Sequence, residues 1–417
     1  MSKEVVIIGG GVIGLSTAYY AAQAGHKVTV IEREPAGRDG CSFGNAGMIV
    51  PSHFIPLAAP GMVQLGFKWM WDPESPFYIK PRFDRELIAW GWKFMRSATR
   101  DHVARAAPLL RDLSLASRGL FEELSVTFGD EFGLVKHGLL MLCKTQHALD
   151  VEAKTAGMAR ELGIPAEVLD ARQTAAQDPA VRMDVTGSVF FPKDCHLHPG
   201  RFMDALQKSC KQAGVKFLWG TEVSGRRVEQ RRIKAISTTA GEIIADEFVL
   251  CGGVWSSSVA LGLGLSIPMQ AGKGYSLTLE QPRQLPALCA IFTEARVAVT
   301  PMNGTLRFGG TMEIGGLNHT INQRRVQGII KSVPQYYPEF QTADFADIAP
   351  WHGLRPCSPD GLPYLGRTKK LANLTLATGH AMMGLSLAPV TGRLMTQLLS
   401  DEKPDIDLAL LSPDRFA

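Results

Sequence analysis

Paired cysteines and metal-binding motifs are missing from this 417-residue sequence. Its seven cysteines are scattered, and no two of them have the spacing of a C-x-x-C motif. We therefore expect free thiols in a reducing compartment and no metal site. The N-terminus enters an apolar, strand-like run almost at once, which leaves no room for a cleavable signal peptide and favours a cytoplasmic location.

Blocks of a single charge are also missing. The 44 basic and 40 acidic residues leave a net charge of +4, and the content of 45% hydrophobic and 20% charged residues is that of an ordinary globular protein. The pairs Arg226-Arg227 and Arg231-Arg232 flank a predicted hairpin or strand and are expected to be solvated. Nucleic acid is therefore not an expected partner.

Uninterrupted hydrophobic segments of membrane-spanning length are lacking too. Residues 40–67, 248–272 and 371–392 contain no Asp, Glu, Lys or Arg, but Gly and Pro interrupt each stretch. These breaks predict buried loops and turns instead of membrane spans. Such segments suit a large cofactor threaded through the core, because close backbone approach favours small residues and a buried flat ring tolerates few unpaired charges.

What the sequence does contain, at its very start, is a dinucleotide-binding fingerprint. An apolar run precedes Gly9-Gly10-Gly11-Val12-Ile13-Gly14, and a second apolar run ends at Glu32. Gly9 allows a tight turn, Gly11 lets a pyrophosphate approach the backbone, and Gly14 lets a helix pack on the sheet. The helix N-terminus favours phosphate, whereas Glu32 can bond ribose hydroxyls and would repel the 2′-phosphate of NADP. The pattern predicts FAD or NAD.

Two domains are expected for a chain of this length. Helical periodicity covers residues 109–124, 155–162, 202–213 and 387–399, the last with Ser386 as its possible cap. Strand-like runs occupy residues 139–143, 187–191, 215–219, 243–251 and 374–378, and short alternating runs over 274–311 indicate an antiparallel sheet. We predict an α/β fold with an α+β second domain. A Rossmann-like nucleotide domain (1–60, 198–270 and 346–417) is interrupted by an antiparallel-sheet substrate domain (61–197 and 271–345).

Four segments beyond the fingerprint resemble the D-amino-acid dehydrogenases, within the larger superfamily of glycine oxidase, sarcosine oxidase and D-amino-acid oxidase. They lie at the beginning, middle and end of the chain, so the resemblance covers nearly all of it. They are Ser42-Phe43-Gly44-Asn45-Ala46-Gly47-Met48, Lys273-Gly274-Tyr275-Ser276-Leu277-Thr278, Gly353-Leu354-Arg355-Pro356 with Pro359-Asp360-Gly361, and Thr378-Gly379-His380. The resemblance implies that the dinucleotide is FAD.

The resemblance also implies roles for single residues. Arg355 is expected to pair with the substrate carboxylate, a bidentate role that suits a planar guanidinium. Tyr275 either reaches the substrate site or packs within its sheet. The loop at 379–384 is implied to lie against the flavin, where a helix N-terminus would stabilise negative charge, with His380 shaping the site. The full set of expected cofactor-binding residues is Gly9, Gly11, Val12, Ile13, Gly14, Glu32, Arg33, Ser42, Gly44, Asn45, Ala46, Gly47, Met48, Val223, Gly252, Trp255, Gly379, His380, Met383, Gly384 and Leu385.

The implied activity is the oxidative deamination of D-amino acids to 2-oxo acids and ammonia. A hydride would pass from Cα to flavin N5, and the electrons would pass to a quinone or another respiratory acceptor. The alternative is an oxidase or dehydrogenase of glycine, sarcosine or a proline-like secondary amine such as D-proline or D-hydroxyproline. It stays open because the Tyr that D-amino-acid dehydrogenases tend to carry in the strand at 294–300 is absent, which leaves Arg296 or Glu294 near that place. A flavin-binding protein without turnover and an NAD-dependent enzyme are further alternatives.

Two other features bear on the cofactor and on partners. His53 follows the flavin-side loop, but no motif for covalent attachment accompanies it, so we predict non-covalent FAD. The segment 66–96 contains Trp69, Trp71, Trp90 and Trp92, interleaved with basic residues. It either touches a membrane surface where quinone is reached or forms a helical flap over the substrate domain. The sequence does not determine the oligomeric state.

Overall fold

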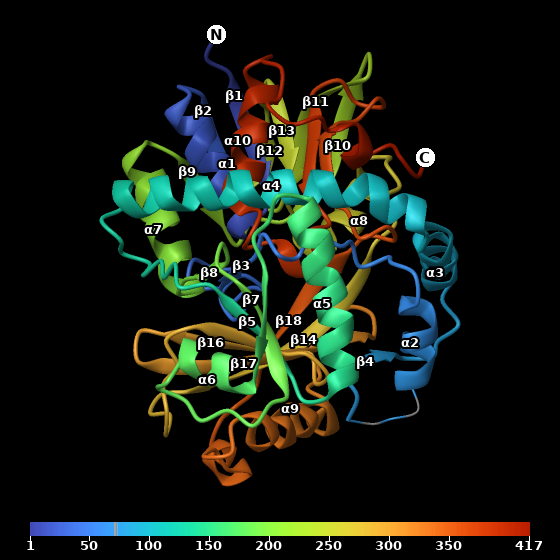
Figure 1. The fold of residues 1–417 in the computed structure, drawn as a ribbon. Coiled ribbons are helices and arrows are strands. Elements are labelled where there is room, and N and C mark those ends of the chain that lie inside the picture. Colours follow the sequence, from blue (N-terminus) through green and yellow to red (C-terminus); the bar gives the residue numbers. More distant parts are fainter. Residues whose placement is uncertain (71, 73) are drawn as a thin grey trace.

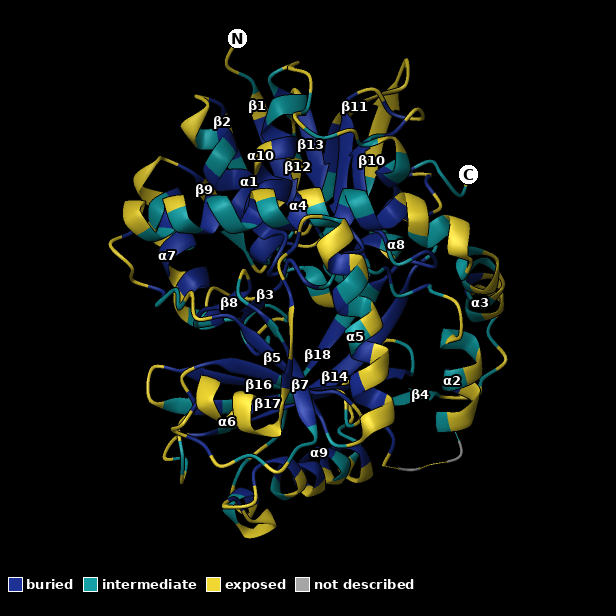
Figure 2. Ribbon diagram, in the orientation of Figure 1, coloured by how far each residue is buried: buried dark blue, intermediate teal, exposed yellow. Residues whose placement is uncertain are grey.

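The computed structural model describes residues 1–70, 72 and 74–417, so Trp71 lies outside the described residues. Two sheets are arranged one above the other in Figure 1, with helices around them. Figure 2 shows buried residues concentrated in the strands of both sheets and exposed residues on the outer helices. Among the described residues, no helix combines the length and apolar character that crossing a membrane requires.

The first sheet has six strands in the order β19-β20-β13-β1-β2-β9. Its strands pair in parallel except at the edge formed by β19, and their short apolar runs are buried, as is typical of a parallel sheet covered on both faces. They are β1 (Glu4–Ile8), β2 (Lys27–Glu32), β9 (Lys216–Trp219), β13 (Glu247–Leu250), β19 (Tyr364–Arg367) and β20 (Leu374–Thr378).

Helices and a small sheet complete this upper part of the molecule. Helices α1 (Val12–Gln23) and α10 (Ala388–Leu399) pack closely, because a Cβ at Gly392 would lie 2.6 Å from the backbone of Ser16. Helix α4 (Arg100–Thr127) crosses in front of them and shares their core (Figure 1). The remaining elements are α7 (Pro199–Gln212), α8 (Ser256–Gly262), β10 (Val223–Glu229), β11 (Arg232–Thr238) and β12 (Gly241–Ile243).

The second sheet has nine strands, which run in the order β18-β14-β17-β16-β15-β5-β7-β6, with β4 paired to β17. Most pairs are antiparallel, and α9 (Gln323–Tyr336) covers one face, below the sheet in Figure 1. The strands are β4 (Phe77–Ile79), β5 (Leu139–Cys143), β6 (Glu167–Asp170), β7 (Gly187–Phe191), β14 (Gln270–Leu279), β15 (Cys289–Phe292), β16 (Val297–Met302), β17 (Thr305–Ile314) and β18 (Trp351–Cys357).

The remaining elements surround this second sheet or connect the two parts. The short strands β3 and β8 pair with each other between the two larger sheets. Helices α2 and α3 lie together at one side of the molecule, on the right in Figure 1. These elements are α2 (Met62–Trp69), α3 (Arg85–Ser97), α5 (Gln146–Glu161), α6 (Ala171–Gln177), β3 (Met48–Ile49) and β8 (Cys195–His196).

The structure corrects two local predictions. The strand expected at 243–251 is shorter: only β13, Glu247–Leu250, enters the parallel sheet, whereas Ile243 is the last residue of β12 in the small hairpin sheet. Ser386 does not cap α10: the cap position is Leu387, and the Ser386 hydroxyl accepts the Val50 N–H at 3.1 Å. By contrast, the strands expected at 139–143, 187–191 and 374–378 are confirmed with the predicted bounds.

The domain boundaries stay a prediction, and two elements run across them. Strand β18 lies in the predicted nucleotide segment 346–417, yet it pairs with β14 in the nine-stranded sheet. Helix α4 lies in the predicted substrate segment 61–197, yet it packs on α10 of the upper part. Both elements therefore border the space between the two sheets.

Candidate active site

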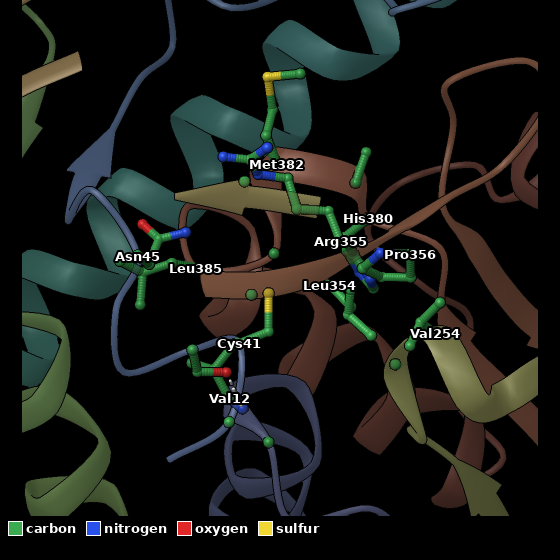
Figure 3. Close-up of a pocket in the computed structure, with 18 of the residues that line it drawn as sticks. Val12, Cys41, Asn45, Val254, Leu354, Arg355, Pro356, His380, Met382 and Leu385 are labelled. Atoms are coloured by element: carbon green, nitrogen blue, oxygen red, sulfur yellow. Dashed lines mark hydrogen bonds between the residues drawn. The ribbon is translucent and has the colours of Figure 1, made fainter. Parts of the chain in front are cut away.

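A cavity of about 1030 Å³ lies between the two parts of the molecule. Its wall combines the fingerprint, the loop at 40–46, the central strands of the large sheet and the loop at 380–385. Figure 3 shows how Val12, Cys41 and Asn45 face Arg355 and His380 across this space. The volume is at the upper end of the ~300–1,000 Å³ range of ordinary ligand pockets, so a large ligand fits.

The fingerprint leaves the N-terminus of α1 open toward the cavity. Gly11 is the N-cap residue and supplies no side-chain cap, and the Val12 N–H donates to Ser42 Oγ at 3.1 Å. A Cβ at Gly9 would lie 2.5 Å from the Cys251 carbonyl oxygen. At Gly11, by contrast, a Cβ would meet no protein atom closer than 3.7 Å, so open space lies beside this backbone. Helix dipole and free space together suit an anionic group.

Glu32 and two arginines form the wall beside the fingerprint. The Glu32 carboxylate accepts the Gly10 N–H at 2.7 Å, which places it at the end of β2 next to the glycine turn. The guanidinium of Arg33 lies 3.9 Å from the centre of the Trp255 ring, and that of Arg38 lies over Trp219. These stacked side chains make a flat wall with polar edges. Nothing in the sequence indicated that Arg38 would belong to it.

The loop at 40–46 is held from the other sheet. Arg307 on β17 donates through Nη1 to the carbonyl oxygens of Phe43 (3.2 Å) and Asn45 (2.8 Å). The Trp351 ring packs directly against Gly44, where a Cβ would overlap the indole. The Trp351 Nε1–H also donates to the Asp39 carboxylate at 2.9 Å. The loop is therefore shaped by β17 and β18, hundreds of residues away in sequence.

Arg355 lies on β18 in the cavity wall, as Figure 3 shows. Its Nη1 donates to the Thr311 carbonyl oxygen at 2.6 Å, and its guanidinium covers Gly274. In the described part of the chain, no carboxylate lies within ion-pair distance of Arg355. Burial lowers the pKa of Arg355, but an arginine remains charged at any ordinary pH. An uncompensated cation in a cavity wall is suited to bind an anion.

Tyr275 also borders the cavity, but its hydroxyl points elsewhere. It donates to Glu313 Oε2 at 3.1 Å and accepts the Asn322 N–H at 3.0 Å. The side chain is 1% exposed and packs in the core cluster that contains Ile329 of α9. Burial raises the pKa of Tyr275. The structure therefore favours packing over a substrate contact, and a direct substrate contact of Tyr275 stays a prediction.

Lys273 shares this face of β14 and joins the same network. Its ammonium donates at 2.6 Å to Asn318 Oδ1 and to the Thr320 carbonyl oxygen, and it lies 3.5 Å from Glu313. A buried lysine requires such partners, because its unpaired charge would be strongly destabilising. The network holds the loop at 315–322, which contributes His319 to the cavity wall.

The loop after β20 closes the cavity near α10. His380 is buried, and its Nε2 lies 3.1 Å from Thr391 Oγ1 on α10. Burial lowers the pKa of His380 to about 3, so the imidazole is neutral. A Cβ at Gly384 would find no protein atom closer than 3.8 Å, which leaves open space beside this loop. The N-terminus of α10 follows and has no side-chain cap.

The sequence matches the family described as "FAD dependent oxidoreductase" (DAO) over residues 4–398. The chain belongs to this family. It is 33% identical to a D-amino acid dehydrogenase of Bradyrhizobium diazoefficiens, with 99% of each chain covered. It is 31% identical to a D-amino acid dehydrogenase of Granulibacter bethesdensis, over 99% of this chain and 100% of the relative.

Solved structures share the fold of this DAO-family chain. Glycine oxidase from Geobacillus kaustophilus superposes with a TM-score of 0.80 at 24% identity, covering 100% of this chain and 99% of the other. L-Proline dehydrogenase from P. horikoshii superposes with a TM-score of 0.75 at 19% identity, covering 100% and 98%. The expected fold, a Rossmann-like FAD-binding part joined to an antiparallel sheet, is confirmed, and the protein is an FAD-dependent oxidoreductase.

The cavity of this DAO-family member fits its cofactor. Open space beside Gly11 and Gly384 marks two backbone cradles at opposite parts of the wall, each next to an uncapped helix N-terminus. Glu32 lines the cavity beside the glycine turn, where its carboxylate would meet the ribose. The described residues contain no cluster of three or more potential metal ligands, and all seven cysteines are free thiols.

Most residues predicted for the site line the cavity, but three glycines lie behind its wall. A Cβ at Gly14 would overlap the Gly9 carbonyl oxygen, Gly47 packs on Leu197 with φ 74°, and Gly379 packs on the Tyr364 ring with φ 78°. These glycines are required for close packing instead of ligand contact. Sequence reasoning missed three wall residues that carry charge or a titratable group, namely Arg38, Asp39 and His319. His53, expected after the flavin-side loop, and Arg296, expected near the place of the missing Tyr, also line the wall.

Proposed function

We propose that the protein is an FAD-dependent dehydrogenase of D-amino acids, which it converts to 2-oxo acids and ammonia. The observation that carries this proposal is Arg355, a guanidinium in the cavity wall that no carboxylate of the described residues neutralises. An α-amino acid brings the carboxylate that this cation lacks. The full-length relatives named D-amino acid dehydrogenase support the same substrate class.

Arg355 binds and orients the substrate. Its hydrogen bond to the Thr311 carbonyl oxygen leaves the other guanidinium N–H groups for a bidentate contact with the carboxylate. The buried setting strengthens this ion pair, because the attraction between charges grows as water is excluded. FAD, when bound, supplies the two-electron acceptor for the hydrogen removed from Cα. Water then hydrolyses the released imine to the 2-oxo acid and ammonia.

The residues proposed to hold FAD follow from the two cradles. Gly9, Gly11 and the first turn of α1 would hold the phosphates, and Glu32 the ribose. The loops at 42–48 and 379–385 would hold the flavin end. We propose non-covalent binding, because no attachment motif accompanies the cavity residues His53 and Cys41.

The electron acceptor is proposed to be a quinone, reached through the face of α2 and α3. Five large apolar side chains are exposed over this short segment, and Trp90 anchors α3 by donating to the Cys357 carbonyl oxygen at 2.9 Å. Basic residues are interleaved with them in the sequence, and Met62, Trp69 and Phe77 of the same segment line the cavity. An amphipathic segment with basic residues beside the cavity suits peripheral contact with an anionic membrane. The exposed apolar residues are Phe67, Phe83, Ile88, Trp92 and Met95.

A second substrate class, secondary amines such as D-proline, D-hydroxyproline or sarcosine, is favoured by one observation. The wall at the turn between β15 and β16 presents Arg296 and Ala298, where the D-amino-acid dehydrogenases tend to carry a Tyr. The wall therefore lacks the hydroxyl that this Tyr would contribute. Glycine oxidase and L-proline dehydrogenase share the fold, which is compatible with either class.

One anaerobic experiment tests the proposal. The purified yellow holoenzyme is mixed with single D- and L-amino acids, glycine, sarcosine and D-proline, and loss of the flavin absorbance band is followed. Bleaching by primary D-amino acids supports the main proposal, and bleaching only by secondary amines supports the second class. Hydrogen peroxide formed under air would identify an oxidase. Absence of bleaching by every amine would contradict both.

A further inference from the structure

Ser52, His53 and Asp194 form a hydrogen-bonded chain that ends in the cavity wall. The Ser52 hydroxyl donates to Asp194 Oδ2 at 2.5 Å and lies 3.0 Å from His53 Nδ1, and the Ser52 N–H donates to Asp194 Oδ1 at 3.1 Å. Asp194 is fully buried between β7 and β8, whereas His53 lines the cavity. The pairing of β3 with β8 brings together residues that lie 142 positions apart.

The other ring nitrogen of His53 is available to a ligand. Nδ1 faces Ser52, and no hydrogen bond within the described residues involves Nε2. His53 lines the cavity, and Nε2 is the ring nitrogen left available to a ligand there. Whether Nε2 accepts or donates depends on the tautomer, and the partner of the opposite nitrogen sets the tautomer.

Protonation of Asp194 reverses the donor-to-acceptor direction of the hydrogen bonds along the chain Asp194–Ser52–His53. When the carboxylate is ionised, Ser52 donates to it, Nδ1–H of His53 donates to Ser52, and Nε2 carries a lone pair. When one proton is added, Asp194 donates to Ser52, Ser52 donates to Nδ1, and the ring carries its proton on Nε2. One proton is gained overall, and the neutral imidazole changes from acceptor to donor in the cavity.

We propose that His53 Nε2 accepts an N–H hydrogen bond from the substrate amine, and that Ser52 and Asp194 are positioning residues that hold His53 in the accepting tautomer. The proposal rests on the amine substrate proposed above. An accepting nitrogen orients the amine so that its lone pair can assist loss of hydrogen from Cα. If Nε2 carried the proton, it would be a donor facing the N–H donors of the amine, and this hydrogen bond could not form.

The charges around the chain are compatible with this role. Burial raises the pKa of Asp194 to about 7, Ser52 and Arg118 on α4 oppose that rise, and the thiols of Cys195 and Cys289 are its other titratable neighbours. Burial and Arg296 lower the pKa of His53 to about 4. His53 is therefore neutral above about pH 5, and only its tautomer changes near neutral pH. Arg296 also disfavours a second cation, which favours a neutral amine.

Nitrogen-15 NMR of histidine-labelled holoenzyme tests the proposal directly. His53 is assigned by the signal lost in His53→Gln, and its tautomer is read between pH 5.5 and 9. We expect Nε2–H below about pH 7 and Nδ1–H above it. In Asp194→Asn, the amide donates to Ser52, so His53 should stay in the Nε2–H form at every pH, as expected for an Asp that sets a histidine tautomer. A tautomer that ignores both pH and Asp194→Asn would overturn the proposal.

Kinetics supply the second measurement. In the wild type, kcat/KM should fall as the pH drops below about 7, which gives an acid limb of the pH profile. This limb is separate from the fall caused by protonation of the substrate amine. Asp194→Asn should remove the limb near pH 7 and lower kcat/KM at pH 8 by about 10- to 100-fold, the size of one lost hydrogen bond to a substrate. Asp178→Asn is the matched control, because Asp178 is equally buried but lies outside the cavity wall. It should keep the limb, and loss of the limb in both variants would contradict the proposal.

Two serine variants cover the case in which Asp194→Asn does not retain FAD. Ser52→Ala breaks the chain, so the tautomer of His53 should no longer respond to pH, whereas Ser52→Thr keeps the hydroxyl and should restore the response. An unchanged response in Ser52→Ala would overturn the proposal. The two proposals can fail separately. The bleaching experiment tests whether amines are substrates, whereas NMR reports on the hydrogen-bonded chain without turnover.

Discussion

The guanidinium of Arg355 lies on the Cα of Gly274, so that a Cβ at residue 274 would overlap the Nη atoms. The two residues are diagonal neighbours in the antiparallel pair β14 and β18, where Gly274 is opposite Gly353 and Gly272 is opposite Arg355. The glycine leaves room for the cation to reach the Thr311 carbonyl oxygen. The position of the anion-binding group is therefore determined by a missing side chain on the neighbouring strand.

Arg355→Ala should raise KM for amino acids by about 30-fold to several thousand-fold, the effect of removing one partner of a buried charge pair. FAD should stay bound, because Arg355 is proposed to contact the substrate and not the cofactor. Gly274→Ala should raise KM in the same direction by displacing the guanidinium. Steady-state kinetics with the flavin spectrum as a control check both variants, and an unchanged KM in Arg355→Ala would remove this arginine from the substrate site.

Glu32→Ala should weaken FAD binding by about 10- to 100-fold, because a carboxylate contributes hydrogen bonds of the charged class. The variant also frees the Gly10 N–H, which now donates to Glu32 at 2.7 Å. Titration of the apoprotein with FAD, followed by flavin fluorescence, measures the change. Glu4→Ala is the control, since Glu4 is an exposed carboxylate at the far end of β1. Equal FAD affinity in both variants would argue against Glu32 as the ribose ligand.

Tyr275→Phe should lower the free energy of unfolding by about 1–3 kcal/mol and leave KM nearly unchanged. The variant leaves Glu313 and the Asn322 N–H without their shared partner in a buried setting. Thermal unfolding of the holoenzyme and kinetics with a single amino acid together decide the point. A large rise in KM without loss of stability would instead show that Tyr275 contacts the substrate.

Relative to the wild type, the stability of the Asp194→Asn variant should rise between pH 5 and pH 8. The folded-state pKa of Asp194, about 7, lies above the ordinary value near 4, so the folded protein binds this proton more tightly than the unfolded chain. The stability contributed by the bound proton is therefore lost as pH rises from about 4 to 7, up to about 4 kcal/mol. Asparagine removes this dependence. Denaturation midpoints measured across this range would contradict the assignment if wild type and variant ran parallel.

The double variant Phe83→Ser, Trp92→Ser should bind anionic lipid vesicles at least tenfold less tightly than the wild type. Both side chains are exposed on the basic surface of α3 and its preceding loop, and each would bury apolar area in the membrane interface. Vesicle co-sedimentation measures binding. The control is Val126→Ser, Ile244→Ser, which removes two exposed apolar side chains elsewhere. Equal loss in both pairs would indicate unspecific adhesion.

Local patterns in the sequence predicted much of the fold. The fingerprint predicted a turn, a helix and two strands in the first part of the chain, and these are β1, α1 and β2. Short runs of five residues that carry no charge predicted β5, β7 and β20, because buried strands contain few charged side chains. The strand at 243–251 was predicted as one element because the run does not show where pairing changes from one sheet to another.

Contacts across long sequence distances could not be predicted in this way. Arg307 reaches the loop at 43–45 only because β17 lies under it, 262 residues away from Asn45 in sequence. Both Gly274 and Tyr275 of β14 border the cavity, and only the pairing with β17 and β18 shows that Arg355 lies over Gly274 while the Tyr275 hydroxyl reaches Glu313. No spacing rule connects Ser52 with Asp194.

The amino-acid sequence by itself determined the cofactor class and the segments that meet it, because glycine turns, helix starts and a carboxylate at a strand end are local features with local causes. Tertiary structure decided which side chains share the cavity. It directed the Tyr275 hydroxyl into the core, left Arg355 without a counter-ion among the described residues, and joined His53 through Ser52 to the buried carboxylate of Asp194. The burial of a side chain and its pairing with other groups depend on residues that are distant in the sequence. The free energy of a charged group is set by these spatial neighbours more than by its neighbours in the sequence.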